Sequence, residues 1–156
     1  MSLAVCVLIS WCAIAVLALI PKKLSTVETV FLFFVCTIFE LSVFTIFHLN
    51  LHWIMVNNHV EQSLADLVIR LVCVPVELVI TSNFMLYSSR PLKFVLMVAV
   101  LLVNVLLQKT LEWLGILFTS HWHLGYTALL VCGYIVFVRL MTFFITHLKQ
   151  TEGEVT

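Results

Sequence analysis

Five long runs of apolar residues are the feature that most constrains this sequence. The core of a bilayer is about 30 Å thick, and a helix crosses it with about 20 apolar residues. Runs of about this length cover residues 3–20, 29–47, 67–87, 92–111 and 124–145. The third run is the least apolar, because Arg70, Pro75 and Glu77 interrupt it. We predict an all-α membrane bundle of five transmembrane helices, forming one domain over 1–150 with a short polar tail at 151–156.

The composition agrees with a protein that is surrounded by lipid. Hydrophobic residues make up 63% of the chain and charged residues 10%, with a mean hydropathy of +1.17. Soluble domains carry about 25% charged residues, so this chain has too few charges to cover a surface in water. We therefore expect the lipid bilayer to be its main partner. The net charge is zero and gives no indication of nucleic-acid binding.

The loop charges predict the orientation of the bundle. Cytoplasmic loops are enriched in Lys and Arg. Five spans would place one group of basic residues on the same side: Lys22, Lys23, Arg90, Lys93 and Lys149. The segments 48–66 and 112–123 contain no Lys or Arg, and Lys109 is the exception to the bias. The N-terminus is then outside and the tail is cytoplasmic. In the four-span alternative the third run is re-entrant, which puts Arg90 and Lys93 on the other side.

Four of the polar residues within the apolar runs form a group: Glu40, Arg70, Glu77 and Asn104. Charged groups inside a membrane are costly and usually face the protein interior or water. At about 1.5 Å per residue, these positions fall in the outer half of the bundle. Arg70 and Glu77 are seven residues apart and share a helix face. We predict one intramembrane cluster. It either fixes helix register through buried hydrogen bonds and an ion pair, or supplies a protonatable carboxylate for transport or sensing.

Two further features lie in the third and fifth runs. Pro75 has no backbone N–H, so it frees the Leu71 carbonyl and predicts a kink beside Glu77. Arg139 lies near the inner end of the fifth run. It can extend its side chain to the headgroups, or it can pair with Glu28 at the start of the second run.

The histidines suggest a metal site on the outer side. His48 and His52 are four residues apart, which puts them on one helix face if the segment is helical. We expect 48–66 to form a short interfacial helix or to extend the second run. Folding could bring these residues near His121 and His123, a set that would suit zinc or copper. The alternatives are ordinary interfacial histidines, or a proton sensor.

The sequence shows no signature of an enzyme. It contains no G-x-S-x-G, no P-loop and no G-x-G-x-x-G, so we expect no catalytic activity and no cofactor. The cysteines lie in apolar runs without a C-x-x-C pair, which argues against disulfides or a cysteine zinc site. They are Cys6, Cys12, Cys36, Cys73 and Cys132.

Three stretches carry a resemblance to known proteins. They are "IPKKLSTVETVF" (20–31), "RLVCVPVELVITSN" (70–83) and "LEWLGILFTSHWHLGYT" (111–127). In these stretches the chain resembles the small multi-pass membrane proteins of Bacillus-type bacteria that have no assigned function. The resemblance implies a bacterial cytoplasmic membrane and a five-helix bundle, and it implies no activity.

We therefore expect a non-enzymatic accessory or structural membrane protein that acts through association with itself or with a membrane-protein partner. Two alternatives stay open. One is a small transporter or proton-coupled sensor that uses the intramembrane cluster. The other is a membrane protein that binds metal at its outer face.

Overall fold

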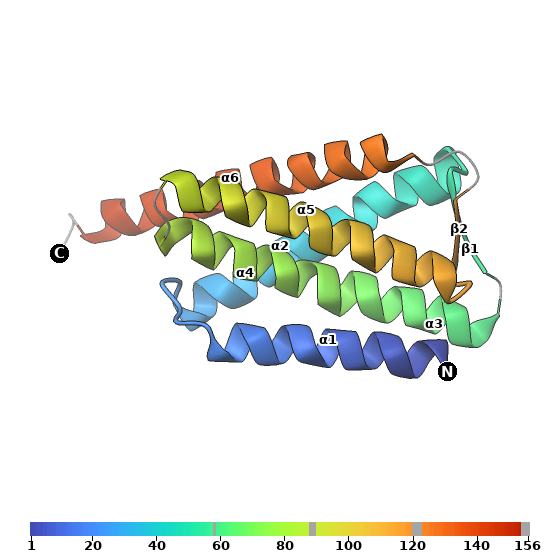
Figure 1. Cartoon of the computed structure of the whole chain (residues 1–156). Coiled ribbons are helices and arrows are strands. Elements are labelled where there is room, and N and C mark those ends of the chain that lie inside the picture. The colour runs from blue at the N-terminus through green and yellow to red at the C-terminus, as the bar shows by residue number, and fades with distance from the viewer. Residues whose placement is uncertain (58, 88–89, 120–122, 154–156) are drawn as a thin grey trace.

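The computed structural model describes residues 1–57, 59–87, 90–119 and 123–153, and it confirms the predicted all-α class. Long helices lie side by side along one axis (Figure 1). The main elements are α1 (Ser2–Leu19), α2 (Thr26–Thr45), α3 (Val60–Val68), α4 (Val74–Tyr87), α5 (Arg90–Trp113) and α6 (Leu124–Gly153). Two π-helical turns join them: η1 (Ile46–Asn50) extends α2, and η2 (Ile69–Cys73) connects α3 to α4.

Four helices of the described chain are long and apolar enough to cross a membrane. They are Ser2–Leu19, Thr26–Asn50, Lys93–Trp113 and Gly125–His147. Large apolar side chains on them point away from the bundle, such as Trp11, which is 70% exposed, and Phe34, which is 58% exposed. Such surfaces need lipid around them, so the chain is a multi-pass helical membrane protein.

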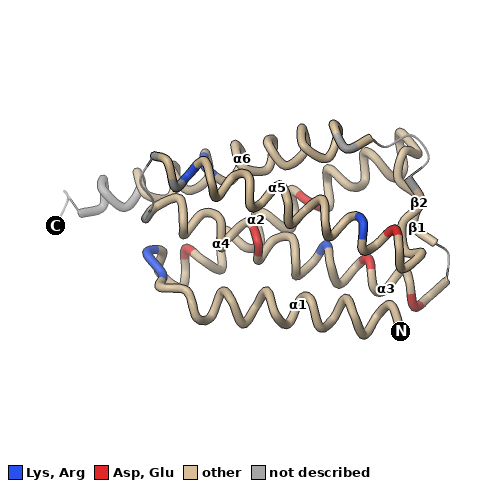
Figure 2. Tube along the Cα trace, viewed as in Figure 1, with Lys and Arg blue, Asp and Glu red and all other residues tan. Residues whose placement is uncertain are grey.

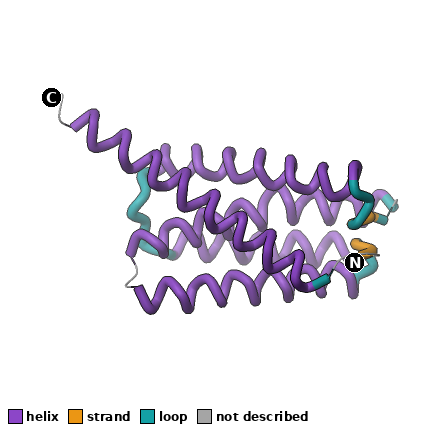
Figure 3. The backbone as a smooth tube through the Cα atoms, turned by 90° about the horizontal axis from the view of Figure 1, so that it is seen from above, coloured by secondary structure: helices purple, strands orange, loops and turns teal. Residues whose placement is uncertain are grey.

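The predicted third run has a different environment from these four helices. Residues 60–87 form the continuous helical segment α3–η2–α4, which contacts α1 and, through α4, also α2, α5 and α6. Seen from above, the helix that leads to the C label runs obliquely across the others (Figure 3). Val76, Leu78 and Val79 of α4 are almost fully buried. This segment therefore faces protein over much of its surface, which is why it tolerates charged residues that a lipid-facing helix would not.

Pro75 has the local effect that its chemistry predicts. The helix widens into the π-helical turn η2 directly before it, and the Val74 N–H bonds to the Ile69 carbonyl. Proline cannot donate to the carbonyl four residues back, and its ring crowds that carbonyl. A π-helical turn relieves this crowding, and such turns also redirect the side chains within them. Arg70 lies inside η2.

The two ends of the bundle differ. At one end, which we call the strand end, β1 (Ile54–Val56) pairs antiparallel with β2 (Leu117–Thr119). The chain's N-terminus lies at this end, and its C-terminus lies at the opposite, far end (Figure 1). The register pairs Ile54 with Thr119 and Val56 with Leu117. The sheet thus joins segments 48–66 and 112–123, which were expected to approach each other.

The prediction of helix in residues 48–66 is confirmed only at the two ends of this segment. The extension of α2 ends at Asn50, and α3 begins at Val60. Between them the chain forms β1 in place of an interfacial helix. Strand pairing gives the polar backbone of this segment partners that a lone turn of helix could not supply.

Candidate functional site

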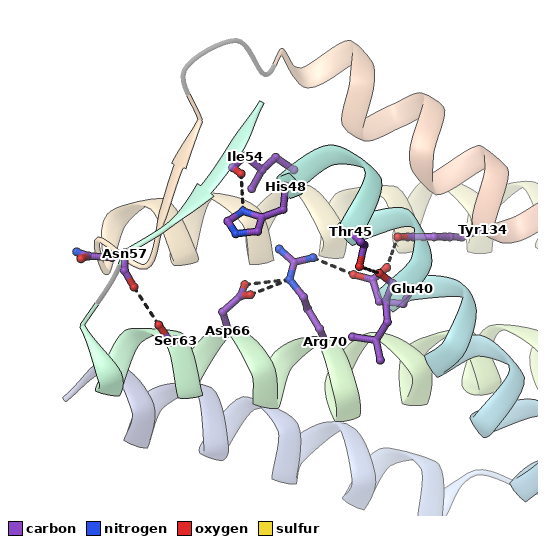
Figure 4. Close-up of polar contacts among 10 residues, drawn as sticks. Glu40, Thr45, His48, Ile54, Asn57, Ser63, Asp66, Arg70 and Tyr134 are labelled. Carbon is purple, nitrogen blue, oxygen red and sulfur yellow. Dashed lines mark hydrogen bonds and ion pairs between the residues drawn. The ribbon is translucent and has the colours of Figure 1, made fainter. Parts of the chain in front are cut away.

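Arg70 is the centre of a charged cluster at the strand end of the bundle. Its Nε donates to Asp66 Oδ1 at 3.1 Å and to Oδ2 at 2.9 Å. Its Nη1 donates to Glu40 Oε1 at 2.9 Å. One guanidinium group therefore bridges two carboxylates that come from different helices, as Figure 4 shows.

Both carboxylates of this cluster are shielded from bulk solvent. Glu40 is 3% exposed and Asp66 is 4% exposed. The Tyr134 hydroxyl of α6 donates to Glu40 Oε2, and the Arg70 guanidinium lies 3.5 Å from the centre of the Phe44 ring. Charged hydrogen bonds and cation–π contacts are strongest where water is excluded. The cluster therefore ties α2, the α3–η2 segment and α6 together.

A second polar pair lies further along the bundle. Asn104 Nδ2 donates to Glu77 Oε1 at 3.0 Å and to the Val100 carbonyl at 2.9 Å. This pair joins α4 to α5. The predicted four-residue cluster thus consists of two contacts, Glu40 with Arg70 and Glu77 with Asn104.

A cavity of about 100 Å³ lies beside these groups, and we call it the strand-end cavity. Its polar lining consists of Glu40, Arg70, Asn104, Gln108, Thr127 and Tyr134. Most of these groups already bond to each other or to neighbours. Thr127 donates to Gln108 Oε1 at 2.6 Å, and Gln108 Nε2 donates to Glu112 at 3.1 Å. A cavity needs roughly 10–15 Å³ of such volume to hold one water, so this cavity has room for several waters or a small solute.

Sequence reasoning missed part of the charged cluster. Asp66 precedes Arg70 by four residues, which is the spacing of a helical ion pair, so its role could have been found. Tyr134 and Phe44 gave no such signal. Both lie in apolar helices whose sequences do not show which face points inward.

The prediction that His48 and His52 share a helix face was wrong. The helix ends at Asn50, and His52 lies beyond it with a φ of 52°. A residue in this left-handed conformation commonly terminates a helix. His48 Nδ1 bonds to the Ile54 carbonyl at 2.8 Å, and its ring stacks on Phe44. Since a carbonyl only accepts, Nδ1 carries the hydrogen, and His48 holds β1 against the end of α2.

One of the two remaining histidines of the predicted metal site, His123, lies within the described residues. His123 is exposed and its ring lies near Tyr126. His121 lies outside the described residues. Within the described part of the chain, no three His, Cys, Asp or Glu side chains are arranged to hold a metal ion. All five cysteines are free thiols, three of them buried.

The predicted pair of Arg139 and Glu28 stays a prediction. Glu28 closes a capping box at the start of α2, where its carboxylate accepts from the Ser25 N–H at 2.6 Å. Arg139 lines a cavity at the far end together with Lys93.

Neutral polar contacts hold the helices together towards the far end. Asn83 Oδ1 accepts from the Lys23 N–H at 3.2 Å and from the Leu24 N–H at 3.5 Å, so it fixes the link between α1 and α2 against α4. Ser82 and Thr142 share a hydrogen bond of 2.6 Å that joins α4 to α6. Asn83 is fully buried.

At the rim of the strand end, the amino group of Met1 hydrogen-bonds to Glu61 of α3. This bond, together with the Leu3 N–H, lowers the pKa of the exposed Glu61 carboxyl. The contact links the start of α1 to α3.

We found no matching protein-family model, no matching curated protein and no matching solved structure for this chain. Its function is therefore argued from its own residues.

Proposed function

We propose that the chain crosses a bacterial cytoplasmic membrane five times, with residues 67–87 as the third span, the N-terminus outside and the tail 151–156 in the cytoplasm. The charge distribution supports this orientation, because basic positions lie towards the far end in Figure 2. Lys22 and Lys23 lie in the α1–α2 link, and Lys93 and Arg139 line one cavity together. Basic residues gather on the cytoplasmic side of membrane proteins. The strand end then faces outwards.

Within that topology, we infer a non-enzymatic accessory or structural protein that acts by association with itself or with a membrane-protein partner. The observation that carries this proposal is the internal pairing of the charged cluster. Arg70 uses its guanidinium on Asp66 and Glu40, and Glu40 also accepts from Tyr134. Groups that satisfy each other in this way fix helix register. The surface that remains for a partner is apolar and within the membrane.

Native mass spectrometry of the protein, extracted from its own membrane in mild detergent, tests this function. We expect either a symmetric oligomer or a reproducible added mass from a partner subunit. Trp11→Ala tests whether the exposed apolar side chain on α1 takes part in this association. Trp113→Ala makes the same change at an exposed position on α5 and is the matched control. A lone monomer in several detergents would contradict the proposal.

The strand-end cavity favours a second candidate, a small transporter or proton-coupled sensor. Glu77 accepts a hydrogen bond from the side-chain amide of Asn104, and Asn104 lines the cavity. The donor to this carboxylate is therefore a neutral amide and not a cation. A carboxylate with only neutral donors gains or loses a proton more readily than one held by arginine. Glu77→Gln should then abolish proton flux into proteoliposomes while the protein still folds. Flux equal to that of the wild type would exclude this candidate.

A further inference from the structure

A second cavity, which we call the far-end cavity, opens between α4, α5 and α6. Its volume is about 180 Å³. Part of its wall is apolar, formed by Met85, Leu86, Val138 and Phe143. The rest is polar and includes the side chains of Lys93 on α5 and Arg139 on α6. The cavity therefore combines a basic region with an apolar wall.

The two cations of this cavity have no anion beside them. No acidic residue lines the cavity, and within the described residues neither Lys93 nor Arg139 makes an ion pair or hydrogen bond. The hydroxyl groups nearby are already used: Thr146 donates to main-chain carbonyls, and Ser82 bonds to Thr142. Arg139 is exposed and Lys93 is partly exposed, so both cations are accessible to an anion from outside the chain.

The depth of the cavity suits a lipid headgroup. Lys93 lies within the first turn of α5, and Arg139 lies six residues before the predicted end of the fifth span, roughly 9 Å along the helix. Both side chains are long enough to reach the headgroup level from there. Basic pockets between transmembrane helices on the cytoplasmic side are suited to anionic headgroups.

We propose that the far-end cavity binds an anionic phospholipid of the adjacent leaflet. Lys93 and Arg139 contact the phosphate oxygens, and the apolar wall contacts an acyl chain. Charge-assisted hydrogen bonds to phosphate supply the recognition, with the planar guanidinium able to make two of them. The site is distinct from the charged cluster around Arg70; it rests on the topology proposed above, and not on the accessory role.

Native mass spectrometry with added phosphatidylglycerol tests this site. The purified chain is titrated with phosphatidylglycerol and, separately, with neutral phosphatidylcholine. We expect preferential binding of one phosphatidylglycerol. Lys93→Gln and Arg139→Gln should each lower that affinity about fivefold. The matched control is Lys22→Gln, which removes the same charge from the same end but outside the cavity.

Three outcomes would overturn the proposal. An equal loss in Lys22→Gln would show general attraction to the basic end of the bundle. Equal binding of phosphatidylcholine would show that the phosphate charge is not recognised through these cations. Displacement of the lipid by millimolar inorganic phosphate would identify free phosphate as the ligand. If a glutamine variant does not fold, Lys93→Arg and Arg139→Lys keep the charges and should retain binding, and loss of binding in these folded variants would also contradict the site.

Discussion

Arg70 and Arg139 are both arginines of membrane helices, and their surroundings are opposite. Arg70 is held by two carboxylates and a phenyl ring at the strand end. Arg139 lines a cavity without an acidic residue towards the far end. A guanidinium neutralised within the chain holds helices together, whereas one without an internal anion is available to an external one. The same side chain thus has a structural role in one half and, in our proposal, a binding role in the other.

The largest effect should follow the loss of the Arg70 charge. Arg70→Gln leaves Glu40 and Asp66 buried without their cation, and breaking a buried ion pair in this way costs about 3–5 kcal/mol. We expect the free energy of unfolding in mixed micelles to fall by about that amount. Denaturation in sodium dodecyl sulfate, followed by circular dichroism, measures it.

A combined variant makes this prediction sharper. Replacing Arg70 with Met and both Glu40 and Asp66 with Leu removes all three charges together. Apolar replacement of a whole buried ion network is often neutral or stabilising. The combined variant should therefore be more stable than Arg70→Gln alone. If it is equally unstable, the cluster contributes more than charge balance.

Asn83→Ala should give the second-largest effect. The change removes the acceptor for the Lys23 and Leu24 N–H groups and leaves those donors without this bond. Loss of a buried hydrogen-bond partner costs about 1–3 kcal/mol. Asn83→Asp keeps an acceptor but adds a charge. Because that charge would be fully buried, it should be worse than Ala, and a stability equal to wild type would contradict the role given to Asn83.

The sequence predicted contacts best where helical spacing or depth in the membrane limited which residues can meet. The prediction places all four polar residues in the outer half of the bundle, and two pairs of them are in contact, Glu40 with Arg70 and Glu77 with Asn104. Hydrophobic run length found the long helices for the same reason, because bilayer thickness sets that length.

The rest could not be predicted because α2 and α6 are apolar on nearly all sides. In a soluble helix the polar face shows which side points outwards, and these two helices have no such face. Tyr134 therefore could not be assigned to Glu40. The end of η1, which extends α2, was missed because no glycine or proline marks it, and the left-handed residue that follows it is His52.

Arg139→Gln should change stability little by itself. Since the side chain has no partner within the described chain, its removal breaks no contact, and surface changes of this kind stay within about 0.5 kcal/mol. The effect should appear with lipid present: phosphatidylglycerol should raise the Tm of the wild type and raise that of Arg139→Gln less. An equal rise in the Tm of both proteins would contradict a binding role for Arg139, and its role would no longer differ from that of Arg70 in this way.

A similarly small effect should follow Lys109→Gln. Lys109 Nζ lies 2.6 Å from Glu112 Oε2, but its side chain is 58% exposed, so solvent screens the pair. Exposed ion pairs contribute about 0–1 kcal/mol, and we expect a value near the lower limit. The comparison with Arg70→Gln is direct, because each change removes one cation from an ion pair at the same end of the bundle. If both variants lost equal stability in the same micelles, burial would not explain the strength of the Arg70 cluster, and the structural role of that cluster would have to be abandoned.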